Sequence, residues 1–205
     1  MILFKRRKQK QIIEMSDLMR VDVMVDIETL GKEADSTIIQ IAAVAFNMED
    51  GKHLSQFNQI VDIEKETTMN TDGSTIKWWL NTNKELLQEL LNKGEHSSED
   101  VLTNFHKWLI GLGKTEDTYL WGNGILFDNK MIQHQMNNLG IGYPIFYKND
   151  RDVRTLVDLA GKKLGISERN LKGMFNSDAY VEHDAIDDVK CQIDLVVGCY
   201  KALYQ

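Results

Sequence analysis

The chain is 205 residues long, with 42% hydrophobic residues, 27% charged residues and a formal net charge of −7. This length is typical of one domain, and the apolar content suffices for a buried core, which excludes disorder as the main state. The longest apolar run, Ile41 to Phe46, is too short to cross a bilayer, so no membrane partner is expected. The acidic charge by itself favours no nucleic-acid partner.

A basic leader precedes the acidic remainder of the chain. Residues 1–20 contain six basic and two acidic side chains, and no apolar segment of the secretory type follows them. We therefore expect a cytoplasmic location, with residues 1–20 as a basic extension and residues 21–205 as one folded domain. The extension is either frayed or in electrostatic contact with nucleic acid. The two cysteines, Cys191 and Cys199, have the spacing of neither a disulfide framework nor a zinc site.

Three segments at the start of the domain have the patterns of strands. Residues 38–46 are almost entirely apolar, as in a strand that is covered on both faces, and residues 57–63 form a weaker third candidate. Residues 21–28 alternate with a period of two. One face of this first strand carries Val21, Val23, Val25 and Ile27, and the other carries Asp22, Met24, Asp26 and Glu28.

Strands and helices alternate in the rest of the chain. Ser97, a residue suited to N-capping, precedes a helical apolar face that runs from Val101 to Leu109. A short strand at 118–121 leads into a glycine-rich turn and a helix that has Asp128 in its first turn. A strand near residue 152, a helix at 156–164 and a last helix at 184–204 follow. The pattern predicts an α/β sheet with helices on both faces.

Asp26 and Glu28 stand at the end of the first strand, two residues apart and therefore on one face. Two ionised carboxylates at this distance suit a hard divalent cation, Mg²⁺ or Mn²⁺, although a solvated strand end has the same pattern. Asp128 lies three and four residues before the apolar stripe of its helix, so we expect it to point toward the sheet. The alternative is an acid that only stabilises a positive helix N-terminus.

The last helix contains acids that point in different directions. At about 100° per residue, Asp187 falls on the exposed arc, whereas Asp188 falls at the edge of the buried arc. Asp187 is then a solvated charge, and Asp188 can reach Asp26 and Glu28. His183 precedes the helix, where its ring could project over the same site or be an incidental loop histidine.

Three motifs of this chain resemble those of the DEDDh exonucleases. They are D-I-E-T at residues 26–29, F-D at 127–128 and H-x-x-x-x-D at 183–188. Within that superfamily, I-K-W-W at 76–79 and R-D-V-R-T at 151–155 resemble the exonuclease A type of T-even phages and its bacterial RNase AS-like relatives. Many relatives carry His-Asn where this chain has Asn123 and Gly124, and often Asp-Thr where it has Arg154 and Thr155.

The resemblance implies a ribonuclease H-like mixed sheet, with three antiparallel strands followed by parallel strands. It also implies two divalent cations, Mg²⁺ or Mn²⁺. Asp26 would bridge both, Glu28 and Asp188 would hold one, and Asp128 would help to position the other. His183 would take the proton from the attacking water. The implied reaction is hydrolysis at a 3′ end, which releases nucleoside 5′-monophosphates.

The resemblance further implies contacts with the terminal nucleotide. Thr29 and Leu30 follow the D-x-E motif where the family places that nucleotide against backbone and an apolar wedge. Trp78 and Trp79 are adjacent, so on a helix they point about 100° apart and cannot be equally buried. Trp78 is our candidate for stacking on a base, and core packing is the alternative for either ring.

Two arginines of the R-D-V-R-T motif are open to two interpretations. Arg151 and Arg154 either contact phosphate or form ion pairs with Asp152 or Asp158. The motif sequence alone does not separate these possibilities.

The leading hypothesis is a metal-dependent 3′–5′ exonuclease that acts on single-stranded ends, with DNA favoured over RNA. The first alternative is a 3′–5′ exoribonuclease of the RNase AS type, because no motif encodes a contact with the 2′-hydroxyl group. A non-catalytic nucleic-acid-binding module and an unrelated magnesium-dependent phosphatase are further alternatives. The subfamily resemblance suggests a phage-encoded protein in the host cytoplasm, and the oligomeric state, a homodimer included, stays open.

Overall fold

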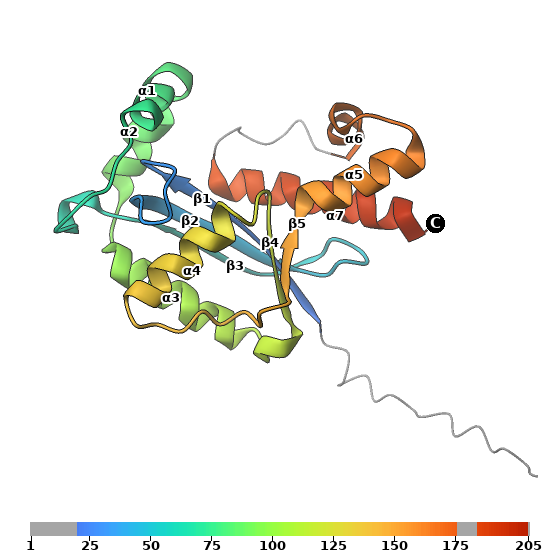
Figure 1. Ribbon diagram of the computed structural model, residues 1–205, viewed down its shortest axis with the longest axis horizontal. Helices are drawn as coiled ribbons and strands as arrows, with labels where there is room; N and C mark the ends of the chain where they lie inside the picture. The colour runs from blue at the N-terminus through green and yellow to red at the C-terminus, as the bar shows by residue number, and fades with distance from the viewer. Residues whose placement is uncertain (1–19, 176–183, 205) are drawn as a thin grey trace, which may run out of the picture.

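A five-stranded mixed sheet with the strand order β3-β2-β1-β4-β5 forms the centre of the molecule (Figure 1). The computed structural model describes residues 20–175 and 184–204. β1 pairs antiparallel with β2, and β2 with β3, whereas β1 pairs parallel with β4, and β4 with β5. This confirms the expected ribonuclease H-like mixed sheet. The strands are β1 (Val21–Thr29), β2 (Ile38–Phe46), β3 (His53–Ile60), β4 (Thr118–Gly122) and β5 (Asp150–Asp152).

Helices cover both faces of the sheet, as expected (Figure 1). α3 and α4 pack on one face, and α5 and α7 pack on the other. No helix in residues 20–175 or 184–204 is both long and apolar enough to span a membrane. The helices are α1 (Gly73–Thr82), α2 (Lys84–Lys93), α3 (Ser98–Gly111), α4 (Asp128–Asn138), α5 (Val153–Leu164), α6 (Glu168–Phe175) and α7 (Ala185–Tyr204), with short 3-10 turns at Ile63–Lys65 and Thr115–Asp117.

The alternation of β1 divides the core into two layers. Val23 and Val25 are fully buried in the layer under α3 and α4. Met24 is fully buried in the layer under α5 and α7. Because side chains alternate along a strand, Asp26 and Glu28 follow Met24 on the α7 side. The period-two pattern of the sequence therefore determines which helices can meet these two acids.

Two helices were not predicted, and the third strand begins earlier than expected. β3 spans His53–Ile60 rather than 57–63, because it is the edge strand and only Phe57 of it is buried, so its apolar pattern is weak. α2 buries Leu86, Leu87 and Leu90 against Trp79 of α1, and α6 buries Leu171. The predicted N-cap of α3 is confirmed, since the Ser97 side chain accepts a hydrogen bond from the backbone N–H of residue 100.

Candidate active site

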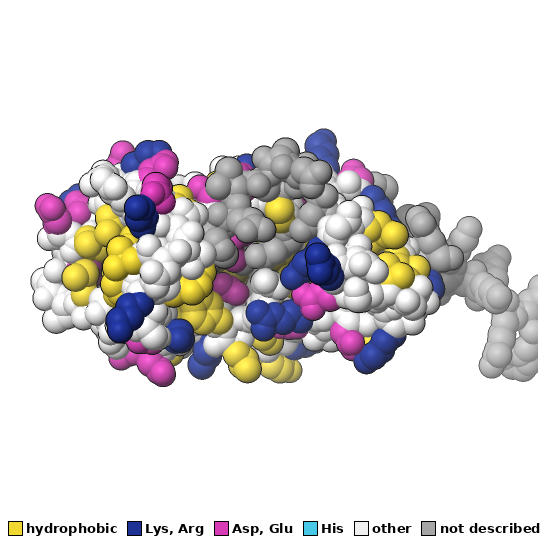
Figure 2. All heavy atoms as spheres, turned by 90° about the horizontal axis from the view of Figure 1, so that it is seen from above, with side chains coloured by type: hydrophobic (Ala, Val, Ile, Leu, Met, Phe, Trp, Pro, Cys, Tyr) yellow, Lys and Arg dark blue, Asp and Glu magenta, His cyan; other side chains and the backbone are white. Residues whose placement is uncertain are grey.

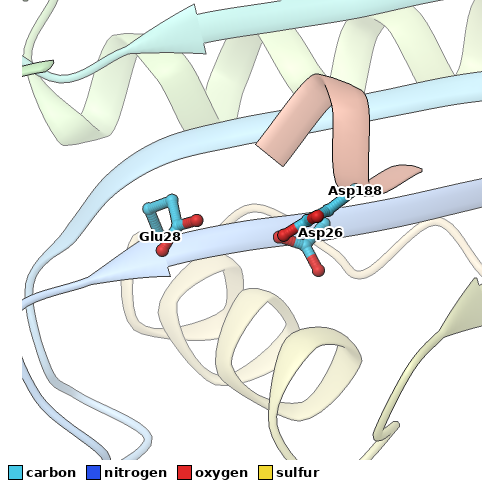
Figure 3. Close-up of side chains that lie close together, drawn as sticks. All are labelled: Asp26, Glu28 and Asp188. Atoms are coloured by element: carbon cyan, nitrogen blue, oxygen red, sulfur yellow. The ribbon is translucent and has the colours of Figure 1, made fainter. Parts of the chain in front are cut away.

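Three carboxylates from two distant segments meet at the end of β1 (Figure 3). Asp26 and Glu28 come from β1 and Asp188 from the first turn of α7, and one oxygen of each lies within 4.8 Å of the others. The predicted direction of Asp188 is thus confirmed. Asp187 points elsewhere and forms an ion pair with Lys190 at 2.9 Å, with its side chain 22% exposed. Asp187 is therefore paired and only partly exposed, rather than the fully solvated charge that the helix pattern predicts.

Asp128 begins α4 and is buried close to the cluster. It lines a cavity of about 340 Å³ together with Asp26 and Arg154. The position depends on Gly122, the last residue of β4, because a Cβ there would lie 2.4 Å from Oδ1 of Asn129 and 3.3 Å from Cβ of Asp128. Only glycine lets α4 begin this close to the sheet. Asp128 is therefore directed toward the sheet, as the apolar stripe of α4 predicts.

Burial and mutual repulsion raise the pKa values of these acids. Burial is the largest cause for Glu28, whose pKa rises to about 9, and the charges of Asp26 and Asp188 raise it further. Burial raises the pKa of Asp128 to about 7, against the opposing effect of backbone hydrogen bonds and of Arg154. Burial and then the charge of Asp128 hold the pKa of Asp26 well above its ordinary value. The donors are all oxygens, which suits a hard divalent cation that displaces the protons.

Gln192 is a site residue that the sequence did not suggest. Its Nε2 atom donates a hydrogen bond of 3.0 Å to Oδ1 of Asp26, and the residue is buried. This hydrogen bond opposes the rise in the pKa of Asp26 and fixes the orientation of the carboxylate. The only signal in the sequence is its spacing, because Gln192 lies one helical turn after Asp188 and hence on the same face of α7.

An apolar pocket of about 500 Å³ lies beside Glu28, and both tryptophans of α1 line it. Trp78 lines the pocket and is 42% exposed. Trp79 is 1% exposed, and its Nε1 atom donates a hydrogen bond of 3.0 Å to the backbone oxygen of Thr29. The expectation that the two rings are unequally buried is confirmed. Figure 2 shows hydrophobic side chains gathered at the left of the upper face, next to the acidic side chains near its middle.

The residues that follow the D-x-E motif differ in what they can contact. Thr29 lines the pocket, and its hydroxyl donates to the backbone oxygen of Gly31. Leu30 is 4% exposed and packs in the hydrophobic cluster of Trp79 and Ile39. Its side chain is not part of the pocket lining, so a side-chain wedge against the nucleotide requires Leu30 to leave this cluster. His183, the predicted base, lies outside the described residues.

Neither arginine of the R-D-V-R-T motif forms the ion pair considered from the sequence. Asp152 instead caps α5 through the backbone N–H of residue 155, and Asp158 pairs with Lys162. Arg151 donates to the backbone oxygens of residues 148 and 150 and lies 4.5 Å from the ring centre of Tyr119. Arg154 is exposed and lies instead at the cavity of Asp26 and Asp128.

The mixed sheet, the helices on both faces and the acids at the end of β1 match the architecture of the DEDDh 3′–5′ exonucleases. The family model described as the 3′-5′ exoribonuclease Rv2179c-like domain matches residues 21–199. The chain belongs to this family, and the resemblance seen in its motifs is confirmed.

Characterised proteins with related sequences or folds agree with this assignment. The exodeoxyribonuclease of Enterobacteria phage T4 is 23% identical over 212 residues, which cover 89% of each protein. The nuclease domain of 3′hExo, a DEDDh family member bound to rAMP, superposes with a TM-score of 0.60 at 18% identity, over 89% of this chain and 92% of that one. Exonuclease I of E. coli in complex with a dT13 oligonucleotide has a TM-score of 0.61 at 19% identity, over 84% of this chain and 39% of that longer one.

Proposed function

We propose that this exonuclease removes nucleotides from the 3′ ends of single-stranded DNA by a two-metal mechanism. The observation that carries the proposal is the convergence of Asp26, Glu28 and Asp188, with Asp128 buried beside them. Asp26, Glu28 and Asp188 would hold one Mg²⁺ or Mn²⁺ ion, and Asp26 and Asp128 would hold the other. Such a pair of cations lowers the pKa of the attacking water and offsets the charge of the phosphate.

Three other residues complete the proposed machinery. His183 accepts the proton of the attacking water, a task suited to an imidazole with an ordinary pKa of about 6.5. The exposed ring of Trp78 stacks on the terminal base, and Thr29 lines the same pocket. Leu30 supports the nucleotide through its backbone while its side chain stays in the core.

The preference for DNA is the finer part of the proposal. The phage exodeoxyribonuclease, which matches this chain over nearly its whole length, supports DNA and a phage-encoded protein in the host cytoplasm. The description of the matching family supports RNA as the second candidate substrate. The two substrates differ in the 2′-hydroxyl group, so a direct comparison of matched strands decides between them.

The test uses end-labelled single-stranded DNA and RNA of one sequence, each with a free or a blocked 3′ end. With Mg²⁺ or Mn²⁺ we expect release of nucleoside 5′-monophosphates from free 3′ ends only, faster from DNA, and no release after chelation. Equal cleavage of blocked ends would refute the proposed polarity. Faster cleavage of RNA would reassign the substrate.

Two adjacent acids of α7 provide a matched pair of variants. Asp188→Ala should abolish release because it removes a cation ligand, whereas Asp187→Ala breaks the ion pair with Lys190, outside the carboxylate cluster, and should retain most activity. His183→Ala should lower the rate by about 10²- to 10⁴-fold, less than the loss of a ligand. Equal activity of the two aspartate variants would contradict the assignment of Asp188.

A further inference from the structure

Gly124 and Arg154, two residues that differ from the motif pattern of many relatives, lie against each other in the structure. Gly124 lies between β4 and α4, and Arg154 lies in the first turn of α5, thirty residues later. A Cβ on Gly124 would lie 3.7 Å from Cζ of Arg154, so the guanidinium group lies directly over this part of the backbone. Both residues line the cavity that also contains Asp26 and Asp128. A cation from α5 therefore stands at the edge of the acidic cluster.

Arg154 has no protein partner for its donors within residues 20–175 and 184–204. No described carboxylate lies within 4.0 Å of its guanidinium nitrogens, and it forms no hydrogen bond with a described group. Its neighbour in the motif, Arg151, does have partners: its guanidinium donates to two backbone oxygens and lies over the ring of Tyr119. The difference indicates that Arg151 stabilises the fold and that Arg154 is available to a ligand.

Charge and shape point to the class of that ligand. The positive charge of Arg154 lowers the pKa of Asp128, so the guanidinium interacts electrostatically with this acid although the two form no ion pair. A guanidinium presents five N–H donors in a planar arrangement that fits phosphate oxygens in a bidentate manner. Because Arg154 lines the same cavity as Asp26 and Asp128, it can donate to an anion that is bound beside these acids. In a nuclease this anion is a phosphate group of the substrate strand.

The positions of the Trp78 pocket and the Arg154 cavity indicate which phosphate of the strand lies near Arg154. Ile27 and Phe127 line both the apolar pocket of Trp78 and the cavity of Arg154, so the two cavities share a wall. With the terminal nucleoside in the pocket and the cleaved phosphate at the carboxylates, the strand continues past this wall into the second cavity. Leu126, which is 87% exposed, lines that cavity and offers an apolar surface to the next base.

We propose that Arg154 binds the phosphate group on the 5′ side of the one that is cleaved. The proposal rests on the proposed function, because it assigns the path of the same substrate strand. It predicts that recognition extends one phosphate beyond the scissile bond. A dinucleotide with a 5′-phosphate should therefore be a better substrate than the same dinucleotide without it.

The experiment compares these two dinucleotides with wild-type protein, Arg154→Gln, Arg154→Lys and the control Arg151→Gln. For the wild type we expect the 5′-phosphate to lower KM by about 10- to 100-fold, the range for a hydrogen bond to a charged group. Arg154→Gln should lose this gain, so that its KM is the same for the two dinucleotides, and Arg154→Lys should keep part of it. Arg151→Gln should keep the full gain even if its thermal stability is lower.

The same comparison by equilibrium binding, with Ca²⁺ in place of Mg²⁺, removes turnover from the measurement. If the wild type cleaves no 3′ end, the proposed function fails, and the binding comparison still decides the role of Arg154. The proposal is overturned if the wild type gains nothing from the 5′-phosphate. It is also overturned if Arg154→Gln keeps the gain or weakens both dinucleotides equally, which would indicate a purely structural role.

Discussion

Replacing Glu28 with glutamine should make the metal-free protein more stable at high pH while it damages the cation site. The pKa of Glu28 rises on folding from 4.5 to about 9, chiefly through burial and then through repulsion by Asp26 and Asp188. Between these two pKa values the folded state holds a proton that the unfolded chain has lost. Folding therefore requires proton uptake, and the stability of the wild type falls as the pH rises from about 4.5 to about 9.

The size of the effect follows from the same shift. Each pKa unit corresponds to about 1.4 kcal/mol, which would give about 5 kcal/mol at pH 8 if Glu28 titrated alone. Because Glu28 is partly exposed and its proton is shared with neighbouring acids, we expect a smaller gain of about 2 to 3 kcal/mol for Glu28→Gln. In a chain of this size that gain raises Tm by about 4 to 12 °C.

Thermal unfolding in chelator from pH 4 to pH 9 measures this prediction. The Glu28→Gln and wild-type curves should meet near pH 4 and separate as the pH rises. Addition of Mg²⁺ should stabilise the wild type more than the variant, because binding to the folded state alone raises Tm. The matched control is Glu85→Gln, whose side chain is 77% exposed on α2, and it should follow the wild type. A Glu28→Gln protein no more stable than the wild type at pH 8 would refute the reasoning.

Two further predictions concern the surroundings of the acids. Gln192→Leu removes the hydrogen bond to Asp26 and should weaken Mg²⁺ binding by about 10- to 100-fold in titration calorimetry, and an unchanged affinity would exclude an orienting role. Trp78→Ala should raise KM with little change in Tm, since the ring is 42% exposed, whereas Trp79→Ala should cost about 3 to 5 kcal/mol of unfolding free energy. Equal losses of stability in chemical denaturation would contradict the different burial of the two rings.

Local patterns were sufficient for the elements that carry the acids. Period-two alternation in β1 placed Asp26 and Glu28 on one face, and the 100° step of a helix placed Asp188 toward them. The same patterns failed for β3, where an edge strand has few apolar positions, and they did not indicate α2. Leu30 was a candidate for substrate contact whose side chain instead joins the hydrophobic cluster of Trp79.

The sequence by itself determined which residue types point to which face of each element, because side-chain direction repeats with the period of the backbone. It thereby predicted that Asp26, Glu28 and Asp188 would face one another. Only the tertiary structure decided which faces meet: Gln192 with Asp26 across 166 positions, and Arg154 with Gly124. The order of strands in the sheet and the packing of helices on it set these distances. Both depend on the whole core, which no single segment encodes.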